Sequence, residues 1–538
     1  MRFFPAAKIF ALFIAIVFLS LQAFGATVTG TVKGPDGAPL MGAFVEAQNT
    51  KTKITVNVLS SKDGRYHVDD LPAGTYDLRV RAIGYRVDPH PGVTLTAKQS
   101  VSYDWALQKG PVRWSDLSLY QGEKLLPSLP GKEMMFGPGT GNRDATCQVC
   151  LGFQTRMAAA RLDADGWRSR IAYMRQAMAF SGPGRLTDEQ AERWVSYVTQ
   201  IFGPNSILPA SAADAPGYKD VVKTFSPDAM NIVYVEYDLA GPNRMPWSAV
   251  PDKAGNIWMP NYGRANSIAR LDPETGKIQE FKVPTEDTAA IHSVFPAPDG
   301  SVWMTEFARS RLARWDPKTE MITEYPDTTP LQGDRKPSKH TVRVGPDGMV
   351  WSSGNPVSRF DPKTGKYDEF PEGSYGVMVD KDGNCWITEY SKEGKIGRID
   401  GKTLKIQTWT PPPSTNNDNG QIYSRRLQFD ADGNVWSSES EGNNIAKFDP
   451  KMEKFTVYPL PGPKATPYAM NLDNNHNAWY SSEYTDIVGR LDTTTGKVTE
   501  YPFPHSEITS REYFLDSQGR MWYASPSNNK VGYFYLAK

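Results

Sequence analysis

The most regular feature of the chain is a ten-residue pattern in which a polar turn precedes a short apolar segment around one tryptophan. The stretch PDGSVWMTEF, residues 298–307, is the clearest copy, and six further stretches share its pattern. Alternating apolar and polar residues that follow a glycine-containing turn predict a β-strand. The tryptophans at the centre of the seven copies are Trp258, Trp303, Trp351, Trp386, Trp436, Trp479 and Trp522.

The spacing of these tryptophans predicts the architecture. It averages about 44 residues, which is the length of a four-stranded propeller blade. Each unit continues with a phrase of the form (S/N)-x-I-(A/G)-(R/K)-x-D-P-x-T-G and a further strand such as MITEYP, but the seventh unit ends with KVGYFYLAK and lacks that strand. A spare strand, NIVYVEYDL, lies before the first unit at 231–239. We therefore predict a seven-bladed β-propeller over residues 229–538, with the spare strand completing the last blade and removing its open edge.

Two other patterns precede the propeller. Residues 27–108 alternate apolar and polar positions between turns rich in Gly, Asp and Pro, which predicts a small antiparallel β-sandwich. Residues 110–225 are helical in character: Thr187 and Gln190 form a capping box, followed by an apolar stripe through Ala191, Trp194, Val195, Val198 and Ile201. The expected fold class is mainly β, with an N-terminal antiparallel β-sandwich and a small helical domain before the seven-bladed propeller.

The N-terminus predicts export. Residues 1–25 contain a basic start with Arg2 and Lys8, an apolar run over residues 9–21, and small residues at Ala23 and Gly25. This is the pattern of a secretory signal peptide, with a retained membrane anchor as the alternative. We expect an exported protein, periplasmic or extracellular, with no integral membrane segment after signal cleavage.

The charge balance excludes one class of partner. Lys and Arg together number 60, as do Asp and Glu, so the net charge is zero. Nucleic-acid binding requires clustered excess positive charge, and no nucleic-acid partner is expected.

Two positions vary between the blades, and both are candidates for a ligand site, since the first strand of each blade lines the channel. The position eleven residues before each tryptophan holds Trp247, His292, His340, Tyr375, Arg425, Tyr468 and Arg511. The position three residues after each tryptophan holds Asn261, Glu306, Gly354, Glu389, Glu439, Ser482 and Ser525. Sevenfold symmetry predicts that these side chains gather near one axis as a polar funnel. A solvated channel without a specific ligand is the alternative.

The phrases D-G-x-V-W-x-T-E and I-A-R-x-D-P-x-T-G-K-x-x-E-Y-P resemble the streptogramin B lyase (virginiamycin B lyase) family over about 310 residues. This resemblance implies Mg²⁺-assisted opening of a cyclic depsipeptide ester by elimination, with a His base and carboxylates on the closing blades. The sequence departs from that pattern where Arg511 and Tyr468 stand on the last two blades and where Ser525 replaces a metal-binding Glu. Arginine cannot act as a base near neutral pH.

The N-terminal segments carry two further resemblances. Residues 27–108 are similar to the carboxypeptidase-regulatory-like (transthyretin-like) domain, an accessory module. Residues 110–225 resemble a degenerate class I cytochrome c, with Cys147 and Cys150 in a CxxC motif. Because Leu151 stands where the haem-binding His would follow, no haem is expected.

Two functions remain open from the sequence. The first is a divalent-metal-assisted lyase or hydrolase at the channel mouth, in which His292 or His340 is the base and Glu306, Glu389 and Glu439 bind Mg²⁺ or another divalent cation. The second is a non-catalytic extracytoplasmic ligand-binding or scaffold protein. There Arg425 and Arg511 hold an anionic ligand, a small molecule or a peptide-like compound, with Trp247, Tyr375 and Tyr468 completing the ligand site.

Overall fold

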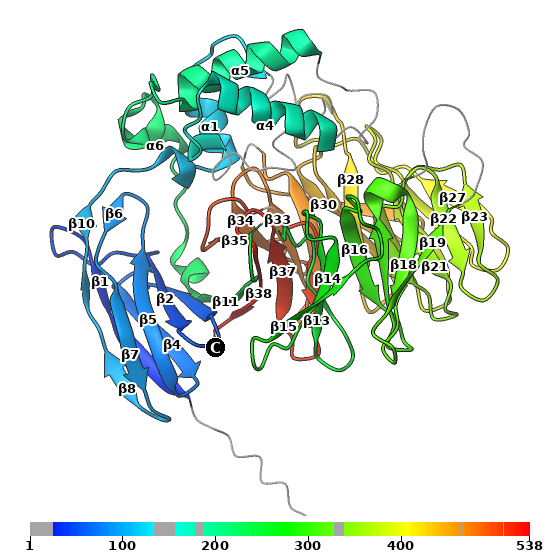
Figure 1. Cartoon of the computed structure of the whole chain (residues 1–538), viewed down its shortest axis with the longest axis horizontal. Helices are drawn as coiled ribbons and strands as arrows, with labels where there is room; N and C mark the ends of the chain where they lie inside the picture. Colours follow the sequence, from blue (N-terminus) through cyan, green and yellow to red (C-terminus); the bar gives the residue numbers. More distant parts are fainter. Residues whose placement is uncertain are drawn as a thin grey trace, which may run out of the picture.

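The structure is a computed structural model of the chain (Figure 1) that describes residues 25–133, 157–177, 187–242, 244–327, 338–462, 464–508 and 510–537. The predicted signal segment up to residue 24 and the Cys147–Cys150 motif lie outside the described residues. Within them, no helix is long and apolar enough to cross a membrane.

The N-terminal region is a β-sandwich of two sheets, as the alternating pattern predicts. One sheet has the order β4-β1-β8, with β9 also paired to β1, and the other contains β3-β2-β5-β7. The inward side chains form a core that includes Val28, Val45, Val68, Leu78 and Trp105. The strands are β1 Ala26–Lys33, β2 Phe44–Asn49, β3 Ile54–Leu59, β4 Arg65–Leu71, β5 Gly74–Arg81, β6 Tyr85–Arg86, β7 His90–Leu95, β8 Ser100–Ser102, β9 Trp105–Ala106 and β10 Gln108–Lys109.

A helical region follows and lies over one side of the propeller (Figure 1). The predicted capping box is present, because the Gln190 amide N–H donates to Oγ1 of Thr187 at 3.1 Å and the Thr187 amide N–H donates to Oε1 of Gln190 at 2.9 Å. The predicted apolar stripe is buried, with Trp194 at its centre. The helices are η1 Trp114–Asp116, α1 Leu119–Leu125, α4 Ala164–Ala177, α5 Asp188–Phe202, η3 Ala212–Asp214, α6 Tyr218–Val221 and η4 Pro227–Asn231.

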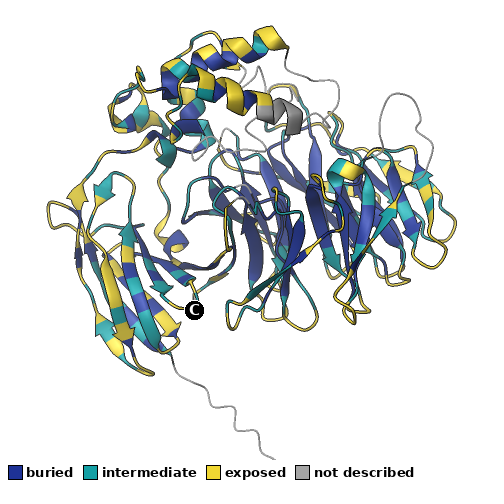
Figure 2. Ribbon diagram, viewed as in Figure 1, coloured by how far each residue is buried: buried dark blue, intermediate teal, exposed yellow. Residues whose placement is uncertain are grey.

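Six antiparallel four-stranded sheets form the first six blades. Their strands are largely buried, in contrast to the exposed turns that join them (Figure 2). Their bounds are β12 Val250–Pro251, β13 Ile257–Asn261, β14 Ser267–Leu271, β15 Ile278–Lys282; β16 Ile291–Pro296, β17 Val302–Glu306, β18 Arg311–Trp315, β19 Ile322–Pro326; β20 Val342–Val344, β21 Val350–Ser352, β22 Val357–Asp361, β23 Lys366–Phe370; β24 Gly376–Val379, β25 Cys385–Thr388, β26 Ile396–Ile399, β27 Ile406–Trp409; β28 Ser424–Phe429, β29 Val435–Glu439, β30 Asn444–Asp449, β31 Lys454–Pro459; β32 Pro467–Leu472, β33 Asn477–Ser482, β34 Ile487–Asp492 and β35 Val498–Pro502. A short 3-10 helix, η5 Phe307–Arg309, follows β17.

The repeated tryptophan is a structural residue of the blade. In five blades its Nε1–H donates to the carboxylate of an Asp six residues earlier, and Trp436 with Asp430 at 2.9 Å is one example. The same Asp accepts backbone N–H groups of the intervening turn, as Asp430 does from Asn434 at 2.9 Å. The D-G turn and the Trp strand are thus fixed to each other, which explains why the phrase recurs.

The seventh blade closes the ring in the predicted way. Its own strands are β36 Phe514–Leu515, β37 Met521–Ser525 and β38 Lys530–Leu536, and its outer strand is the N-terminal β11 Ile232–Asp238. β11 pairs antiparallel with β38 over seven residues, from Ile232 opposite Leu536 to Asp238 opposite Lys530. The spare strand therefore supplies what the last unit lacks.

The free edge of that strand is covered by the sandwich. β11 also pairs antiparallel with β3, and the last blade and one sandwich sheet become a single eight-stranded sheet in the order β36-β37-β38-β11-β3-β2-β5-β7. Glu236 of β11 is fully buried at this junction. It accepts hydrogen bonds from Asn57 Nδ2 at 3.2 Å and Tyr523 Oη at 2.9 Å, and its Oε2 lies 2.6 Å from His505 Nε2. The sequence did not predict this continuity.

Candidate functional site

The side chains found eleven residues before each tryptophan meet around the propeller axis and form a closed ring, which we call the collar. Each member contacts the next in chain order, and the guanidinium of Arg511 closes the ring 4.2 Å from the ring centroid of Trp247. The structure thus brings together all seven residues that a constant offset selects: Trp247, His292, His340, Tyr375, Arg425, Tyr468 and Arg511.

Two histidines from adjacent blades form the closest contact in the collar. The ring centroids of His292 and His340 are 3.8 Å apart, and Nδ1 of His340 lies 3.0 Å from Oγ1 of Thr341. Burial lowers the pKa of both imidazoles well below the ordinary value, and the positive charges of Arg426 and Arg511 lower it further. Both rings are therefore neutral at pH 7, a state in which an imidazole can accept a proton.

The two arginines of the collar are held between aromatic rings. The Arg425 guanidinium lies 4.1 Å from the Tyr468 centroid and 4.6 Å from that of Tyr390. Arg511 lies 5.0 Å from the Tyr468 centroid and donates to its hydroxyl oxygen at 2.7 Å. Cation–π contacts and hydrogen bonds of this kind hold a buried guanidinium without neutralising its charge.

Below the collar lies a buried ion triad. Arg343 Nη2 is 2.5 Å and Arg426 Nη1 is 3.6 Å from Oε1 of Glu512. Burial alone raises the pKa of Glu512, but the two guanidinium groups outweigh it and hold the pKa below its usual value. Glu512 therefore stays ionised and offsets one of the two positive charges.

Irregular backbone positions several of these side chains. The register of the first and second strands shifts between Ile291 and Ser293, between Ser424 and Leu427, and between Pro467 and Met470. A β-bulge re-aims the residues within it. The bulges contain His292, Arg425 with Arg426, and Tyr468. Arg425 can therefore lie in the collar while the next residue, Arg426, belongs to the ion triad.

A hydroxyl group two residues after the tryptophan ties neighbouring blades together at the collar. Ser438 Oγ accepts from the Arg426 backbone N–H at 3.1 Å and donates to the Tyr468 carbonyl oxygen of the next blade at 2.8 Å. Thr305 and Thr388 link to the carbonyls of His340 and Arg425 in the same way. These hydroxyls, which sequence reasoning overlooked, recur at a constant offset and were therefore available as a signal.

The position four residues after the tryptophan supplies the layer above the collar. Tyr262 and Phe307 contact His292 with centroids 5.9 and 5.7 Å away, and the Tyr390 hydroxyl oxygen accepts from Arg425 Nη2 at 3.0 Å. Glu483 Oε1 lies 3.9 Å from Arg511 Nη2. Burial raises the pKa of Glu483, although Arg511, Arg425 and Arg426 oppose this shift. These side chains are partly exposed.

The glutamates predicted as metal ligands lie one position earlier, and each is engaged within its own blade. Glu306 Oε2 accepts from Thr285 Oγ1 at 3.0 Å and lies 3.4 Å from Arg311 Nε. Glu439 Oε2 accepts from Asn444 Nδ2 at 3.1 Å, and Glu389 Oε2 accepts from Ser391 Oγ at 3.3 Å. Burial raises the pKa of Glu306 and of Glu439 to about 7.

Among the described residues, no group of three or more His, Cys, Asp or Glu side chains is arranged to hold a metal ion. The three glutamates are thus not gathered into one cation site, and each carboxylate is engaged by a different set of neighbours. The donors present do not fit a Mg²⁺ site assembled from these residues, and binding of a divalent cation stays a prediction.

The fold and the collar define the C-terminal part of the chain as a seven-bladed β-propeller with a polar, aromatic ring of side chains at its axis. Residues 363–536 match the model of the Virginiamycin B lyase family, and residues 27–108 match that of the Carboxypeptidase regulatory-like domain. Both resemblances predicted from the sequence are confirmed over these segments. A search of curated proteins finds no match.

Solved structures give the same result for the propeller. A streptogramin B lyase structure is 25% identical with a TM-score of 0.50, and the match covers 58% of this chain and all of the lyase. Virginiamycin B lyase from Staphylococcus aureus is 25% identical with a TM-score of 0.50, covering 57% of this chain and 100% of that protein. A catalytically inactive form of the S. aureus enzyme with quinupristin is 24% identical with a TM-score of 0.50, again over 57% and 100% of the two chains, and shows the fold alone.

Proposed function

We propose that the protein is a ligand-binding propeller whose channel mouth binds a small anionic molecule, with Arg425 and Arg511 as the main recognition groups. One observation carries this proposal. Among the described residues, four buried arginines lie in and around the collar, Arg343, Arg425, Arg426 and Arg511, and the ion pairs found there are with two carboxylates, Glu483 and Glu512. Buried positive charge is costly, so an anion that reaches these guanidinium groups gains favourable interactions.

The mouth also supplies groups that orient such a ligand. Arg425 Nε is buried without a hydrogen-bond partner in the described part of the chain. The guanidinium fork suits a carboxylate because it offers parallel N–H donors. Aromatic rings from Tyr262, Phe307 and Tyr390 surround the entrance and favour a ligand that combines a carboxylate with a flat apolar body.

Isothermal titration of benzoate into the full chain tests this proposal. We expect saturable binding that becomes at least about tenfold weaker in Arg425→Lys and Arg511→Lys, because lysine keeps the charge and loses the fork. The control is Arg359→Lys, since Arg359 pairs with Asp368 on the outer part of a blade. Equal affinities in all four proteins would contradict the proposal.

A second candidate function is favoured by the histidine pair. Neutral His292 or His340 at the mouth can take a proton from the carbon next to the one that carries the ester oxygen. A C=C bond then forms as the C–O bond breaks, and the carboxylate leaves with its negative charge stabilised by the arginines. Incubation with quinupristin, followed by mass spectrometry, tests this. A ring-opened product of unchanged mass that is lost in His292→Asn/His340→Asn would establish an eliminating enzyme and overturn the non-catalytic proposal.

Metal dependence is tested separately. Titration of Mg²⁺, Mn²⁺ and Ca²⁺ into wild type and Glu306→Gln/Glu389→Gln measures whether any of these ions binds. Stoichiometric binding that the double variant loses would restore the metal-assisted lyase or hydrolase. Absence of binding by the wild type favours recognition by the arginines.

We also propose that the protein is exported to the periplasm or the cell exterior. The basic start, apolar run and small residues of positions 1–25 support this. Cell fractionation with N-terminal sequencing of the mature protein tests it. Recovery of uncleaved protein from the cytoplasm would contradict it.

A further inference from the structure

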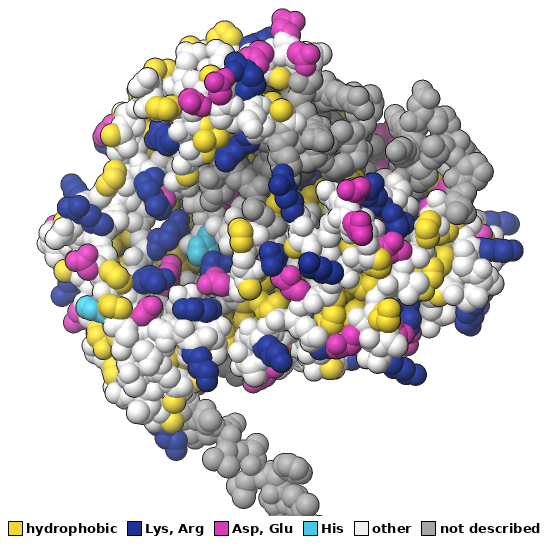
Figure 3. Space-filling model, in the orientation of Figure 1, with side chains coloured by type: hydrophobic (Ala, Val, Ile, Leu, Met, Phe, Trp, Pro, Cys, Tyr) yellow, Lys and Arg dark blue, Asp and Glu magenta, His cyan; other side chains and the backbone are white. Residues whose placement is uncertain are grey.

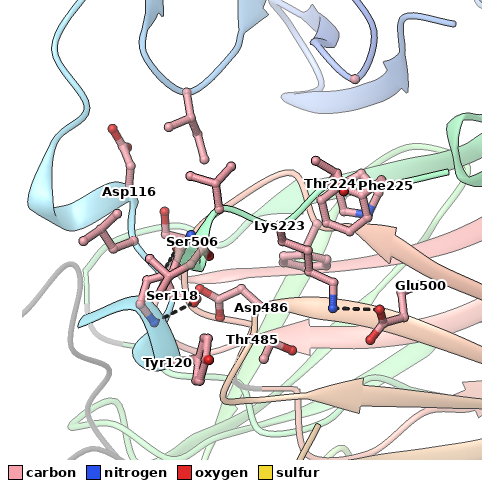
Figure 4. A pocket seen from close by; sticks show the side chains of 18 of the residues that line it. Asp116, Ser118, Tyr120, Lys223, Thr224, Phe225, Thr485, Asp486, Glu500 and Ser506 are labelled. Atoms are coloured by element: carbon pink, nitrogen blue, oxygen red, sulfur yellow. Dashed lines mark hydrogen bonds and ion pairs between the residues drawn. The ribbon is translucent and has the colours of Figure 1, made fainter. Parts of the chain in front are cut away.

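A cavity of about 610 Å³ lies where the sandwich, the helical region and the propeller meet, away from the collar. Figure 4 shows side chains from separate segments lining it: Asp116, Ser118 and Tyr120, then Lys223, Thr224 and Phe225, and from the propeller Thr485, Asp486, Glu500 and Ser506. Its volume is in the range of small-molecule sites, which occur preferentially between domains.

The charges around the cavity are largely matched to partners. Lys223 Nζ lies 2.7 Å from Glu500 Oε2, and Lys464 Nζ lies 3.2 Å from an oxygen of Glu123. Arg81 donates to the Pro504 carbonyl oxygen at 2.6 Å. The lining therefore shows no strong excess of either sign, which distinguishes it from the collar and disfavours a highly charged ligand.

Apolar side chains form much of the remaining wall. They come from all three parts of the chain, with Phe44 from the sandwich, Phe225 from the segment before β11 and Phe503 from the propeller. Ile83 and Val222, which also line the cavity, are 49% and 44% exposed. An apolar occupant of the cavity would remove part of these two side chains from water, which is favourable.

One polar group gives the cavity a specific acceptor. His505 lines the wall, and its Nε2 lies 2.6 Å from Oε2 of the buried Glu236. A carboxylate only accepts, so Nε2 carries the proton of that contact, and in the neutral ring Nδ1 is a hydrogen-bond acceptor. His505 Nδ1 has no protein partner among the described residues.

We infer that the junction cavity is a binding site for an uncharged, largely apolar small molecule that carries one N–H or O–H donor for His505. This site is independent of the proposed function of the collar. Because its walls belong to three parts of the chain, an occupant would also hold the sandwich, helical region and propeller together, and would protect all three from local opening.

Indole and N-methylindole are matched probes, since they differ by the single N–H donor. Isothermal titration into the full chain is expected to show saturable binding of indole that is about fivefold tighter than that of N-methylindole, the effect of one hydrogen bond. Equal affinities for the two probes would contradict the role of His505.

Substitutions that fill the cavity test whether indole binds there. Ala82→Trp and Thr224→Trp place bulk on the sandwich and linker walls respectively, and each is expected to weaken indole binding at least about tenfold. Ala106→Trp, at an exposed sandwich position outside the cavity, is the control. No saturable indole binding by wild type, or equal binding by the filled variants and the control, would overturn the inference. Binding of benzoate at the collar is measured separately, so the two sites are distinguishable.

Discussion

The imidazoles of His292 and His340 lie with ring centroids 3.8 Å apart and planes inclined by 37°, although 47 residues separate them along the chain. The contact joins two blades at the axis and packs two titratable groups against each other. Protonation of either ring places a charge beside its neighbour and beside Arg426 and Arg511. The pair therefore makes the propeller sensitive to acid.

The first prediction concerns this sensitivity. In the unfolded chain each imidazole takes up a proton near its ordinary pKa of 6.5, whereas in the folded protein the pKa lies well below that value. Below pH 6.5 the unfolded state therefore binds more protons than the folded state. The free energy of unfolding is highest above that pH and falls as the pH is lowered. We expect the free energy of unfolding of wild type to decline between pH 6.5 and 5 more steeply than that of His292→Phe/His340→Phe.

Urea unfolding at a series of pH values measures the free energy of unfolding of both proteins. The slope against pH is expected to differ by up to about 1.4 kcal/mol per pH unit for each imidazole that is protonated only in the unfolded chain. The control is His67→Phe, at an exposed position of the sandwich. Parallel pH profiles for wild type and the double variant would show that the two rings titrate normally.

The second prediction concerns the hydroxyl that links two blades. Ser438→Ala leaves the Arg426 N–H and the Tyr468 carbonyl oxygen without their partner, and each is buried. We expect a loss of about 1–3 kcal/mol in the free energy of unfolding, measured by urea denaturation. Ser437→Ala is the matched control, because the hydroxyl of Ser437 is buried with no hydrogen-bond partner in the described structure. An equal effect of the two substitutions would refute the linking role.

The collar was predictable because the blade repeats. Fixed strand and turn lengths give every blade the same geometry, so a constant offset from Trp303 or Trp436 selects residues at the same distance from the axis. The residue type at that position then identifies candidate ligand-binding residues, because the packing of a blade does not require a histidine such as His292 or an arginine such as Arg511 there.

The layer above the collar was not predictable from the same offset argument. Glu306 and Glu439 are the last residues of their strands and accept hydrogen bonds from side chains outside the collar, whereas Phe307 and Glu483, one position further in their blades, reach the collar. The direction of a side chain where a strand ends depends on the backbone of the turn that follows. Counting residues from the tryptophan does not determine the backbone conformation of that turn.

The union of sandwich and propeller was likewise not predictable. The pattern of β11 marks it as a strand and its place in the chain suits the last blade, but pairing at its second edge depends on how two separately folded units dock. Tyr234 opposite Asn57 in β3 is a register that neither segment encodes alone. The buried Glu236 was the sequence signal, as a charged residue within an apolar strand.

The third prediction concerns Glu439. Its pKa is raised from 4.5 to about 7 by burial, so the folded protein holds a proton that the unfolded chain has released. Stability therefore falls as the pH rises from 4.5 to 7, by up to about 3 kcal/mol, and stays reduced above that pH. Glu439→Gln removes this cost and keeps an acceptor for Asn444. Its melting temperature is expected to exceed that of wild type at pH 8 and to match it at pH 4.5.

Glu274→Gln, at an exposed turn position, is the control for Glu439→Gln. Differential scanning calorimetry at the two pH values provides the comparison. A lower melting temperature of Glu439→Gln at pH 8 would mean that the ionised carboxylate stabilises the fold, as a bound cation would require.

The fourth prediction concerns the junction between sandwich and propeller. Burial raises the pKa of Glu236, but His505, Lys530 and Tyr523 outweigh that effect, and the pKa lies below its usual value of 4.5. Ionised Glu236 therefore stabilises the fold above pH 4.5. This contribution is lost as the pH falls through the lower pKa that Glu236 has in the folded protein. Glu236→Gln is expected to cost about 2 kcal/mol at pH 7, the effect of losing a charged hydrogen-bond partner. The difference from wild type should shrink toward pH 3.

Hydrogen exchange read out along β3 and β11 measures where that loss acts. Because the carboxylate joins Asn57 of the sandwich to His505 and Tyr523 of the propeller, faster exchange is expected in both strands of the junction and unchanged exchange in the outer strands of the fourth blade. Glu453→Gln, at an exposed turn of the fifth blade, serves as the control. Faster exchange confined to one side of the junction would mean that the two units do not share a single cooperative sheet.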